Sequence, residues 1–328
     1  MIIKSKKYIF KSILLIMILC LICPVFAGCS SSREKIRENS KLKIVTTLFP
    51  EYDWVRNIVG NSNRFDIQLL VDSGVDMHSY QPTADDIITI STCDLFIYNG
   101  GESDSWVKDI ISSAGNKNLV VIDLMSTLGG KLKKEEDVEG MQTEEDGDEK
   151  EYDEHIWLSA KNAKLLCSSI KDALSMLDKK NEAAYAANLE AYSKKLDELD
   201  NDYAKAIKES KHDTLIFADR FPFRYLTDDY GLKYFAAFSG CSAECEASFE
   251  TVSFLAQKLD ELGISKLLVL ENASPSLADT IISSSSSKNA TVLTINSMQS
   301  VTKEDIAKNI SYIELMKANL ENIKQALN

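Results

Sequence analysis

Short apolar runs alternate with amphipathic segments over most of the chain after residue 40. Near-continuous apolar runs of this length are typical of parallel strands that helices cover on both faces. One group precedes residue 160 and a second follows residue 210; the runs are 42–49, 65–71, 93–100, 118–124, 214–219, 232–238, 266–272 and 291–296. The pattern predicts two similar parallel α/β lobes, with ligands bound beyond the carboxyl ends of the strands.

The segments between these runs have helical features. The segments 50–60 and 82–92 each begin with proline, which suits the first turn of a helix. A final helix is expected from about Lys303 to Ala326. The longest helix is expected from Glu182 to Glu209, about 42 Å at ~1.5 Å per residue.

The long helix has one apolar stripe, because its apolar residues recur at alternating steps of four and three. A coiled coil is the alternative, but only about three heptads are present and a second α/β pattern follows directly. We interpret the helix as a rigid strut between the lobes. The stripe comprises Tyr185, Leu189, Tyr192, Leu196, Leu199, Tyr203 and Ala206.

The segment 133–154 interrupts the pattern with twelve acidic residues against three lysines and is expected to form a solvated loop. The predicted organisation has five parts. These are a signal peptide (1–28), a tether (29–40), an N-terminal α/β lobe (41–160) that contains the acidic loop (133–154), linking helices (161–210) and a C-terminal α/β lobe (211–328).

The N-terminus has the features of an export signal. Lysines precede an apolar run, 12–27, that is short for a membrane span. The run ends in "VFAGCS", which resembles a bacterial lipoprotein cleavage box, although Phe26 stands where an aliphatic residue is usual. We expect lipidation of Cys29 and attachment to the outer face of the bacterial cell membrane. An uncleaved anchor or an ordinary signal peptide is the alternative.

Charge and cysteine content narrow the function. The formal net charge of −13 becomes −17 without the four lysines of the signal, which excludes nucleic acid as a partner and favours a cation. Four cysteines remain beyond Cys29, too scattered for a disulfide framework. Cys241 and Cys245 could form a bridge or share a soft metal, but no second pair accompanies them, so a thiolate zinc site is not favoured.

The chain has three histidines, and two of them lie at predicted lobe edges. His78 lies in "GVDMHSYQPTADD", beyond the second strand, and His155 lies in "DEHIWLSA", where the chain returns to a core. A single histidine of this kind is usually structural, but two in an acidic chain favour a metal site. His212 lies at the polar start of a strand and is interpreted as a surface residue.

These two motifs, together with the long helix and "ADRFPFRYLTDDYGL", resemble the metal-binding lipoproteins that supply zinc or manganese to ABC importers. The resemblance covers essentially the whole mature chain. It implies two α/β lobes joined by a backbone helix, with one metal between them. His78 and His155 match the first two metal ligands of that family.

The other two ligand positions depart from the family pattern. Arg220, which cannot bind a cation, stands where relatives have His or Glu, and Asn296 stands where they have Asp. We therefore predict Asp219 and Glu244 as oxygen ligands, with Glu246 and Glu271 as substitutes. Arg220 could orient one of these carboxylates or form a surface ion pair.

The predicted function is extracytoplasmic capture of a divalent transition metal and its delivery to an ABC permease by a monomeric receptor that is not an enzyme. Zn²⁺ is expected from the usual affinity order, and Mn²⁺ is the alternative because oxygen ligands favour it. Two hypotheses are less favoured: a surface adhesin with a structural metal, and a metallohydrolase. The sequence contains no HExxH or GxSxG motif to support an enzyme.

Overall fold

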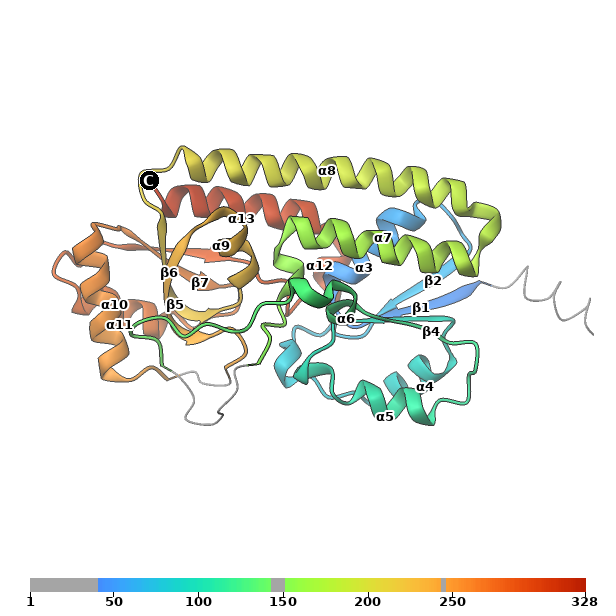
Figure 1. The fold of residues 1–328 in the computed structure, drawn as a ribbon. Helices are drawn as coiled ribbons and strands as arrows, with labels where there is room; N and C mark the ends of the chain where they lie inside the picture. The colour runs from blue at the N-terminus through green and yellow to red at the C-terminus, as the bar shows by residue number, and fades with distance from the viewer. Residues whose placement is uncertain (1–40, 143–150, 243–245) are drawn as a thin grey trace, which may run out of the picture. The chain divides into compact units, whose positions relative to one another are not determined.

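The computed structural model describes residues 41–142, 151–242 and 246–328 and contains two four-stranded sheets (Figure 1). All eight predicted strands form. The first sheet has the order β2-β1-β3-β4, and the second has β6-β5-β7-β8. The strands are β1 (Leu42–Thr46), β2 (Phe65–Leu69), β3 (Leu95–Tyr98), β4 (Val120–Asp123), β5 (Thr214–Phe221), β6 (Lys233–Ser239), β7 (Lys266–Leu270) and β8 (Thr291–Ile295).

We call the first sheet with its helices the first lobe. Its helices are α3 (Phe49–Val59), α4 (Ala84–Thr92), α5 (Val107–Ser113) and α6 (Leu124–Leu128), with the 3-10 turns η2 (Met77–Ser79), η3 (Glu102–Asp104) and η4 (Gly129–Lys131). Pro50 lies in the first turn of α3, as predicted. Pro82 instead precedes α4, because the Thr83 side chain caps that helix.

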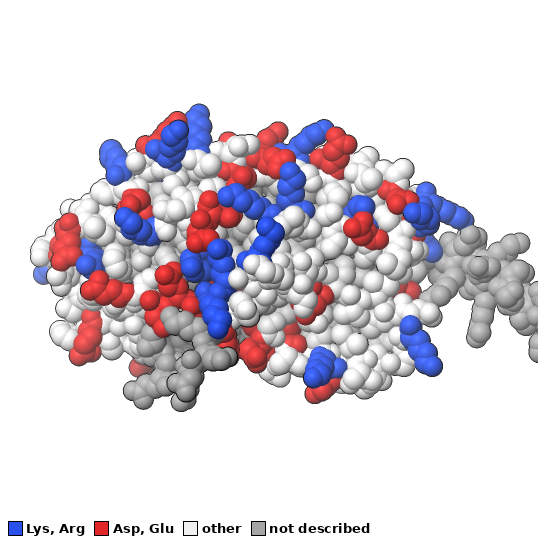
Figure 2. Space-filling model, viewed as in Figure 1, with Lys and Arg blue, Asp and Glu red and all other residues white. Residues whose placement is uncertain are grey.

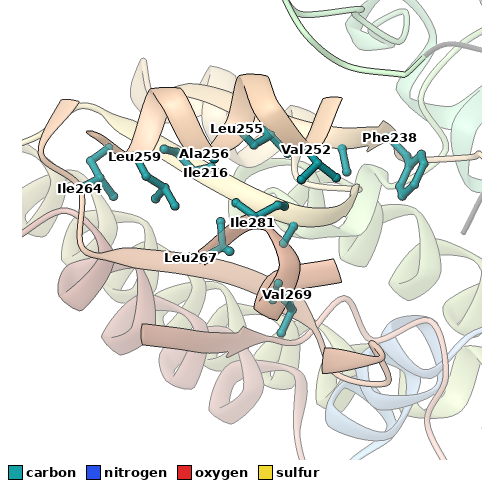
Figure 3. Packing of buried hydrophobic residues seen from close by; sticks show 13 residues of the cluster. Ile216, Phe238, Val252, Leu255, Ala256, Leu259, Ile264, Leu267, Val269 and Ile281 are labelled. Carbon is teal, nitrogen blue, oxygen red and sulfur yellow. The ribbon is translucent and has the colours of Figure 1, made fainter. Parts of the chain in front are cut away.

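The second lobe consists of the second sheet with α9 (Arg224–Tyr230), α10 (Phe249–Leu262), α11 (Pro275–Ser284), α12 (Lys303–Ala307) and α13 (Tyr312–Ala326). Figure 3 shows Leu255 and Leu259 of α10 and Ile281 of α11 packing towards Leu267 and Val269 of β7. Leu268 and Leu270, which alternate with the last two, are also buried. Because strand side chains alternate between faces, both faces of β7 are covered.

The predicted strut forms as α8 (Glu182–Lys208), which follows α7 (Ala160–Leu177) and the short η6 (Lys179–Asn181). Figure 1 shows α8 alongside α7 and α13, and it also contacts α3. Five residues of the predicted stripe are buried: Tyr185, Tyr192, Leu196, Leu199 and Tyr203. The Tyr203 hydroxyl donates to the Met316 carbonyl of α13 at 2.7 Å. One helix thus packs on helices of both lobes.

The prediction of one final helix from Lys303 to Ala326 was wrong. The segment forms two helices, α12 and α13, because Asn309 between them has a left-handed backbone with φ of 57°. Ser311 then caps α13 by accepting a hydrogen bond from the Glu314 backbone N–H.

The described ends of the acidic segment, residues 133–142 and 151–154, are more closely packed than the predicted solvated loop. Lys134 pairs with Tyr152, and Gln142 adds to the second sheet by pairing with Phe238 of β6. Asp153 and Glu154 are 1% and 3% exposed. The ends of this segment therefore belong to the packed structure, where carboxylates need specific partners.

Charged residues of both signs lie side by side on the face drawn in Figure 2, so that face has no large patch of one sign among the described residues. Within the part of the chain that the structure describes, no helix is long and apolar enough to cross a membrane.

Candidate metal centre

His78 is held by the loop that follows β2. The Asp76 side chain caps η2 and accepts a hydrogen bond from the His78 backbone N–H at 3.0 Å. The imidazole Nδ1 lies 2.8 Å from Ser103 Oγ in η3 and 3.7 Å from Glu154 Oε2. These contacts direct Nε2 away from Ser103 and leave it available as a ligand.

His155 lies just before the turn η5 (Ile156–Leu158) and is fully buried. Asp153 Oδ1 accepts the His155 backbone N–H at 2.8 Å and lies 3.0 Å from His155 Nδ1. Because an ionised carboxylate can only accept, the hydrogen resides on Nδ1. His155 Nε2 therefore presents a lone pair, the arrangement that carboxylates impose on metal-binding histidines.

The two free imidazole nitrogens face each other, with His78 Nε2 3.2 Å from His155 Nε2. Two Zn–N bonds of ~2.0–2.1 Å at a tetrahedral angle set their nitrogens about 3.3–3.4 Å apart. The observed spacing is therefore close to what a single tetrahedral cation requires.

Electrostatics around the pair also suits a cation. Burial, and then the neighbouring His155, lower the pKa of His78 to about 3, so this imidazole stays neutral at physiological pH. Burial alone would lower the pKa of His155, but the carboxylates of Asp153 and Glu154 outweigh it and raise that pKa. Glu154 Oε2 is buried and accepts no hydrogen bond from the described residues, and burial raises the pKa of this carboxyl.

Cys241 is the third potential ligand at this place. A ligand atom from each of His78, His155 and Cys241 lies within 4.8 Å of the other two. Cys241 forms no disulfide with any cysteine that the structure describes, so its thiol is free there. Burial raises the pKa of this thiol, followed by the nearby Glu135 carboxylate.

The structure does not bring Asp219 into this group of three. Asp219 Oδ1 accepts the Arg220 backbone N–H at 2.8 Å, and Oδ2 accepts the Leu270 backbone N–H at 3.0 Å. Asp219 and His78 both line a cavity of about 450 Å³. The register of β5 against β6 shifts between Phe217 and Arg220, and such a bulge re-aims the side chains beside it.

Arg220 pairs with a carboxylate other than the predicted ones. One guanidinium nitrogen lies 2.5 Å from Asp76 Oδ2, and Asp76 Oδ1 accepts the His78 backbone N–H. Arg220 of β5 is thus linked to the loop that positions His78, through a bond between the two lobes.

The remaining candidates have other partners, are exposed, or lie outside the described residues. Glu271 accepts hydrogen bonds from the Ser297 backbone N–H and hydroxyl, both at 2.8 Å. Asn296 Oδ1 accepts the Met298 backbone N–H. Glu246 is exposed. Glu244 and Cys29, predicted as metal ligand and lipidation site, lie outside the described residues, as does Cys245.

Sequence reasoning missed the residues that orient the imidazoles. Asp153 stands two residues before His155 in "DEH", and this spacing could have identified it as a partner. Ser103 and Glu154 reach His78 only through folding. The sequence relates Cys241 only to Cys245, because the chain gives no local sign that residue 241 comes near two histidines far away in sequence.

The chain is similar to known zinc-uptake and zinc-binding proteins. Residues 44–326 match the family described as "ZnuA: Zinc-uptake complex component A periplasmic". The zinc-binding lipoprotein AdcA of Streptococcus pneumoniae is 31% identical over 316 residues, which are 94% of this chain and 60% of that protein. The high-affinity zinc uptake system protein ZnuA of Bacillus subtilis is 30% identical over 304 residues, 92% of this chain and 93% of that protein.

Two solved structures share the fold. The metal-dependent lipoprotein YcdH of Bacillus subtilis has a TM-score of 0.72 at 30% identity, covering 88% of this chain and 99% of that one. The Zn(II)-bound ZnuA-like domain of Streptococcus pneumoniae AdcA has a TM-score of 0.69 at 29% identity, with coverage of 88% and 99%. The predicted two-lobe α/β fold is confirmed. The match with this chain covers only about 60% of the length of the AdcA proteins.

The family match extends over both sheets and includes His78, His155 and Cys241. The chain therefore belongs to the ZnuA family of zinc-uptake substrate-binding components, the class that the motifs around His78 and His155 resembled.

Proposed function

We propose that this protein captures Zn²⁺ outside the cytoplasm and delivers it to an ABC-type permease. The observation that carries the proposal is the 3.2 Å separation of His78 Nε2 and His155 Nε2, each directed by polar partners on its other ring nitrogen. Two such nitrogens can bind one borderline divalent cation between them.

Relatives support zinc as the cargo. AdcA of Streptococcus pneumoniae is named a zinc-binding lipoprotein, and ZnuA of Bacillus subtilis is named a high-affinity zinc uptake system protein. The usual affinity order also places zinc above manganese at sites rich in imidazole. A manganese receptor is the alternative, and it requires mainly oxygen donors around the two histidines.

His78 and His155 are the proposed nitrogen ligands. Asp219 would have to bind the ion while its oxygens accept two backbone hydrogen bonds, so we place it beside the metal rather than on it. Glu244 remains a prediction from the sequence. Asp153 and Ser103 hold the Nδ1 sides of the imidazoles and act through them.

Delivery requires that the protein be held near its permease. We propose that lipidation of Cys29 attaches it to the outer face of the cell membrane and that it acts there as a monomer. The relative's designation as a lipoprotein and the "VFAGCS" segment support this part of the proposal. No covalent chemistry is required of the protein, because binding and release are sufficient for transport.

Reversible exchange tests the proposal. The purified protein is freed of metal with a chelator and titrated with Zn²⁺ in competition with Mn²⁺, while circular dichroism follows the fold. We expect one tight zinc site, weaker manganese binding, and a folded protein both with and without metal. Unfolding on chelation would instead assign the metal a structural role, and absence of saturable zinc binding would refute the proposal.

A further inference from the structure

Cys241 reaches the histidines because of the residue before it. β6 ends at Ser239, and Gly240 follows directly. A Cβ on Gly240 would lie 2.9 Å from the Phe221 carbonyl oxygen and 3.0 Å from His155 Cε1, closer than side-chain carbons normally approach. Only glycine therefore fits against the imidazole, and this close approach brings the next residue, Cys241, to the pair.

The backbone of Cys241 is also held by a residue of the acidic segment. Its N–H donates to Glu135 Oε1 at 3.0 Å. Glu135 belongs to the acidic segment that leads to His155, and its own backbone N–H donates to the Glu151 carbonyl. The segment that carries one histidine therefore also holds the cysteine in place.

The distances allow one ion to bind all three residues. Bonds of ~2.3 Å to sulfur and ~2.0–2.1 Å to nitrogen at a tetrahedral angle set the two donor atoms about 3.6 Å apart. Cys241 Sγ and one ring nitrogen of each histidine lie within 4.8 Å of one another. A movement of roughly 1.2 Å or less by the thiol would complete the set, well within what side-chain rotation provides.

We propose that Cys241 Sγ binds the captured ion as a thiolate, together with His78 Nε2 and His155 Nε2. This inference rests on the proposed function and specifies its ligand set. The thiol S–H bond breaks when the S–metal bond forms, and the proton leaves to the buffer without any change of oxidation state. Arg220 ion-pairs with Asp76 and cannot bind a metal ion, so the sulfur of Cys241 supplies the third metal ligand.

A ligand set of two nitrogens and one sulfur is softer than one of nitrogens and carboxylates. Thiolates favour zinc strongly, whereas manganese favours carboxylate, carbonyl and water oxygens. Cys241 is therefore inferred to be the residue that makes the site selective for zinc against manganese.

Cobalt provides a direct test, because Co²⁺ bound to a thiolate has an intense charge-transfer absorption in the near ultraviolet, whereas Co²⁺ bound only to nitrogen and oxygen does not. The metal-free protein is titrated with Co²⁺ as wild type, C241S, C245S and D219N. We expect the absorption in wild type, C245S and D219N and its loss in C241S. Its retention in C241S, or its loss in C245S alone, would overturn the assignment.

Zinc affinities from competition with a chelator separate this inference from the proposed function. We expect C241S to bind zinc at least about tenfold more weakly while H78A/H155A loses binding. Zinc affinity of C241S within about twofold of wild type, with H78A/H155A inactive, would refute only the role of Cys241. A wild-type protein that binds neither cobalt nor zinc would refute both.

A substitution that changes the donor atom tests selectivity. C241D replaces sulfur with a carboxylate at the same place, and we expect the ratio of zinc to manganese affinity to fall at least about tenfold. Melting of the metal-free variants is followed alongside to verify that each is folded. An unchanged ratio in a folded C241D would contradict the assignment.

Discussion

The metal centre and the surroundings of Asp53 are two buried clusters of polar residues, and they differ in how their polar atoms are paired. At the metal centre, two imidazole nitrogens face each other at 3.2 Å, and Glu154 Oε2 accepts no hydrogen bond from the described part of the chain. Where α3, α8 and α13 meet, the Asp53 carboxylate accepts hydrogen bonds from the Tyr312 backbone N–H, the Asn57 amide and the Tyr192 hydroxyl. The first cluster presents two imidazole nitrogens that can bind a cation, whereas the Asp53 carboxylate has its partners within the chain.

We infer from this difference that the metal centre serves metal binding and that the Asp53 cluster serves the stability of the fold. A buried polar atom without a partner costs free energy, and a cation bound by the two imidazole nitrogens would offset that cost for the neighbouring Glu154 Oε2. A buried carboxylate whose partners come from three helices fixes those helices relative to one another. Substitutions at the metal centre should therefore change metal binding, and substitutions at Asp53 should change folding stability.

The largest effect is expected from replacing both imidazoles. H78A/H155A removes both proposed nitrogen ligands, so zinc affinity should fall by at least about a thousandfold. Thermal melting with and without zinc measures the result, because ligand binding stabilises the folded state by mass action. We expect the zinc-induced rise in melting temperature to disappear.

The matched control is the third histidine. His212 lies before β5, and its backbone N–H donates to the Leu327 carbonyl, a bond that H212A retains. H212A should keep the full zinc-induced shift. If H78A/H155A kept that shift as well, the ion would have to bind elsewhere in the molecule.

An intermediate effect is expected from Asp153, whose carboxylate lies 3.0 Å from His155 Nδ1. D153A removes the acceptor for His155 Nδ1, so the imidazole is free to turn and its basicity falls. Loss of such a partner typically costs about 10–100-fold in metal affinity. Competition titration with a chelator should show this loss, and D153N, which keeps one acceptor oxygen, should recover part of it.

D279N is a suitable control, because Asp279 is exposed on α11. Its zinc affinity should match that of wild type. Equal zinc affinities of D153A and D279N would mean that the surrounding packing alone orients His155. The hydrogen bond between Asp153 and His155 would then contribute nothing to metal binding.

The fold was largely predictable because it follows from local periodicity. Eight apolar runs produced eight strands, and the stripe from Tyr185 to Tyr203 produced one buried face of α8. The break between α12 and α13 was not predictable from that periodicity, since it depends on the left-handed backbone of Asn309. Periodicity reports which face is buried but not where a helix is interrupted.

The site was predictable only in part. His78 and His155 stand out because the chain has only three histidines and these two lie at predicted lobe edges. Their convergence, and the arrival of Cys241 beside them, depend on tertiary packing across 77 and more residues. Asp219 is predicted as a ligand because it stands next to Arg220, where relatives have His or Glu, but the strand register shifts there and Asp219 accepts the Leu270 backbone N–H.

The smallest effect is expected at Asp53, and it concerns stability alone. Burial raises the pKa of Asp53 from 3.8 to about 6, so the folded protein holds this proton more tightly than the unfolded chain does. A group of this kind stabilises the fold fully below about pH 3.8, and the contribution is lost as the pH rises through 6. A pKa difference of this size corresponds to about 3 kcal/mol at most, and water penetration reduces it, so we expect about 1–2 kcal/mol.

D53N should remove this pH dependence. The hydrogen bonds from Tyr312, Asn57 and Tyr192 all go to one oxygen, Oδ2, which an asparagine carbonyl can replace, and asparagine has no charge to desolvate. Urea unfolding of metal-free protein at about pH 4.5 and pH 7.5, on either side of the raised pKa, measures the difference from wild type, with D172N on the exposed face of α7 as control. Wild type should lose more stability than D53N between these pH values, while zinc affinity stays equal. If D53N weakened zinc binding instead, the helix junction and the metal centre would be coupled through α13, where the Tyr312 hydroxyl donates to the Trp157 carbonyl two residues beyond His155.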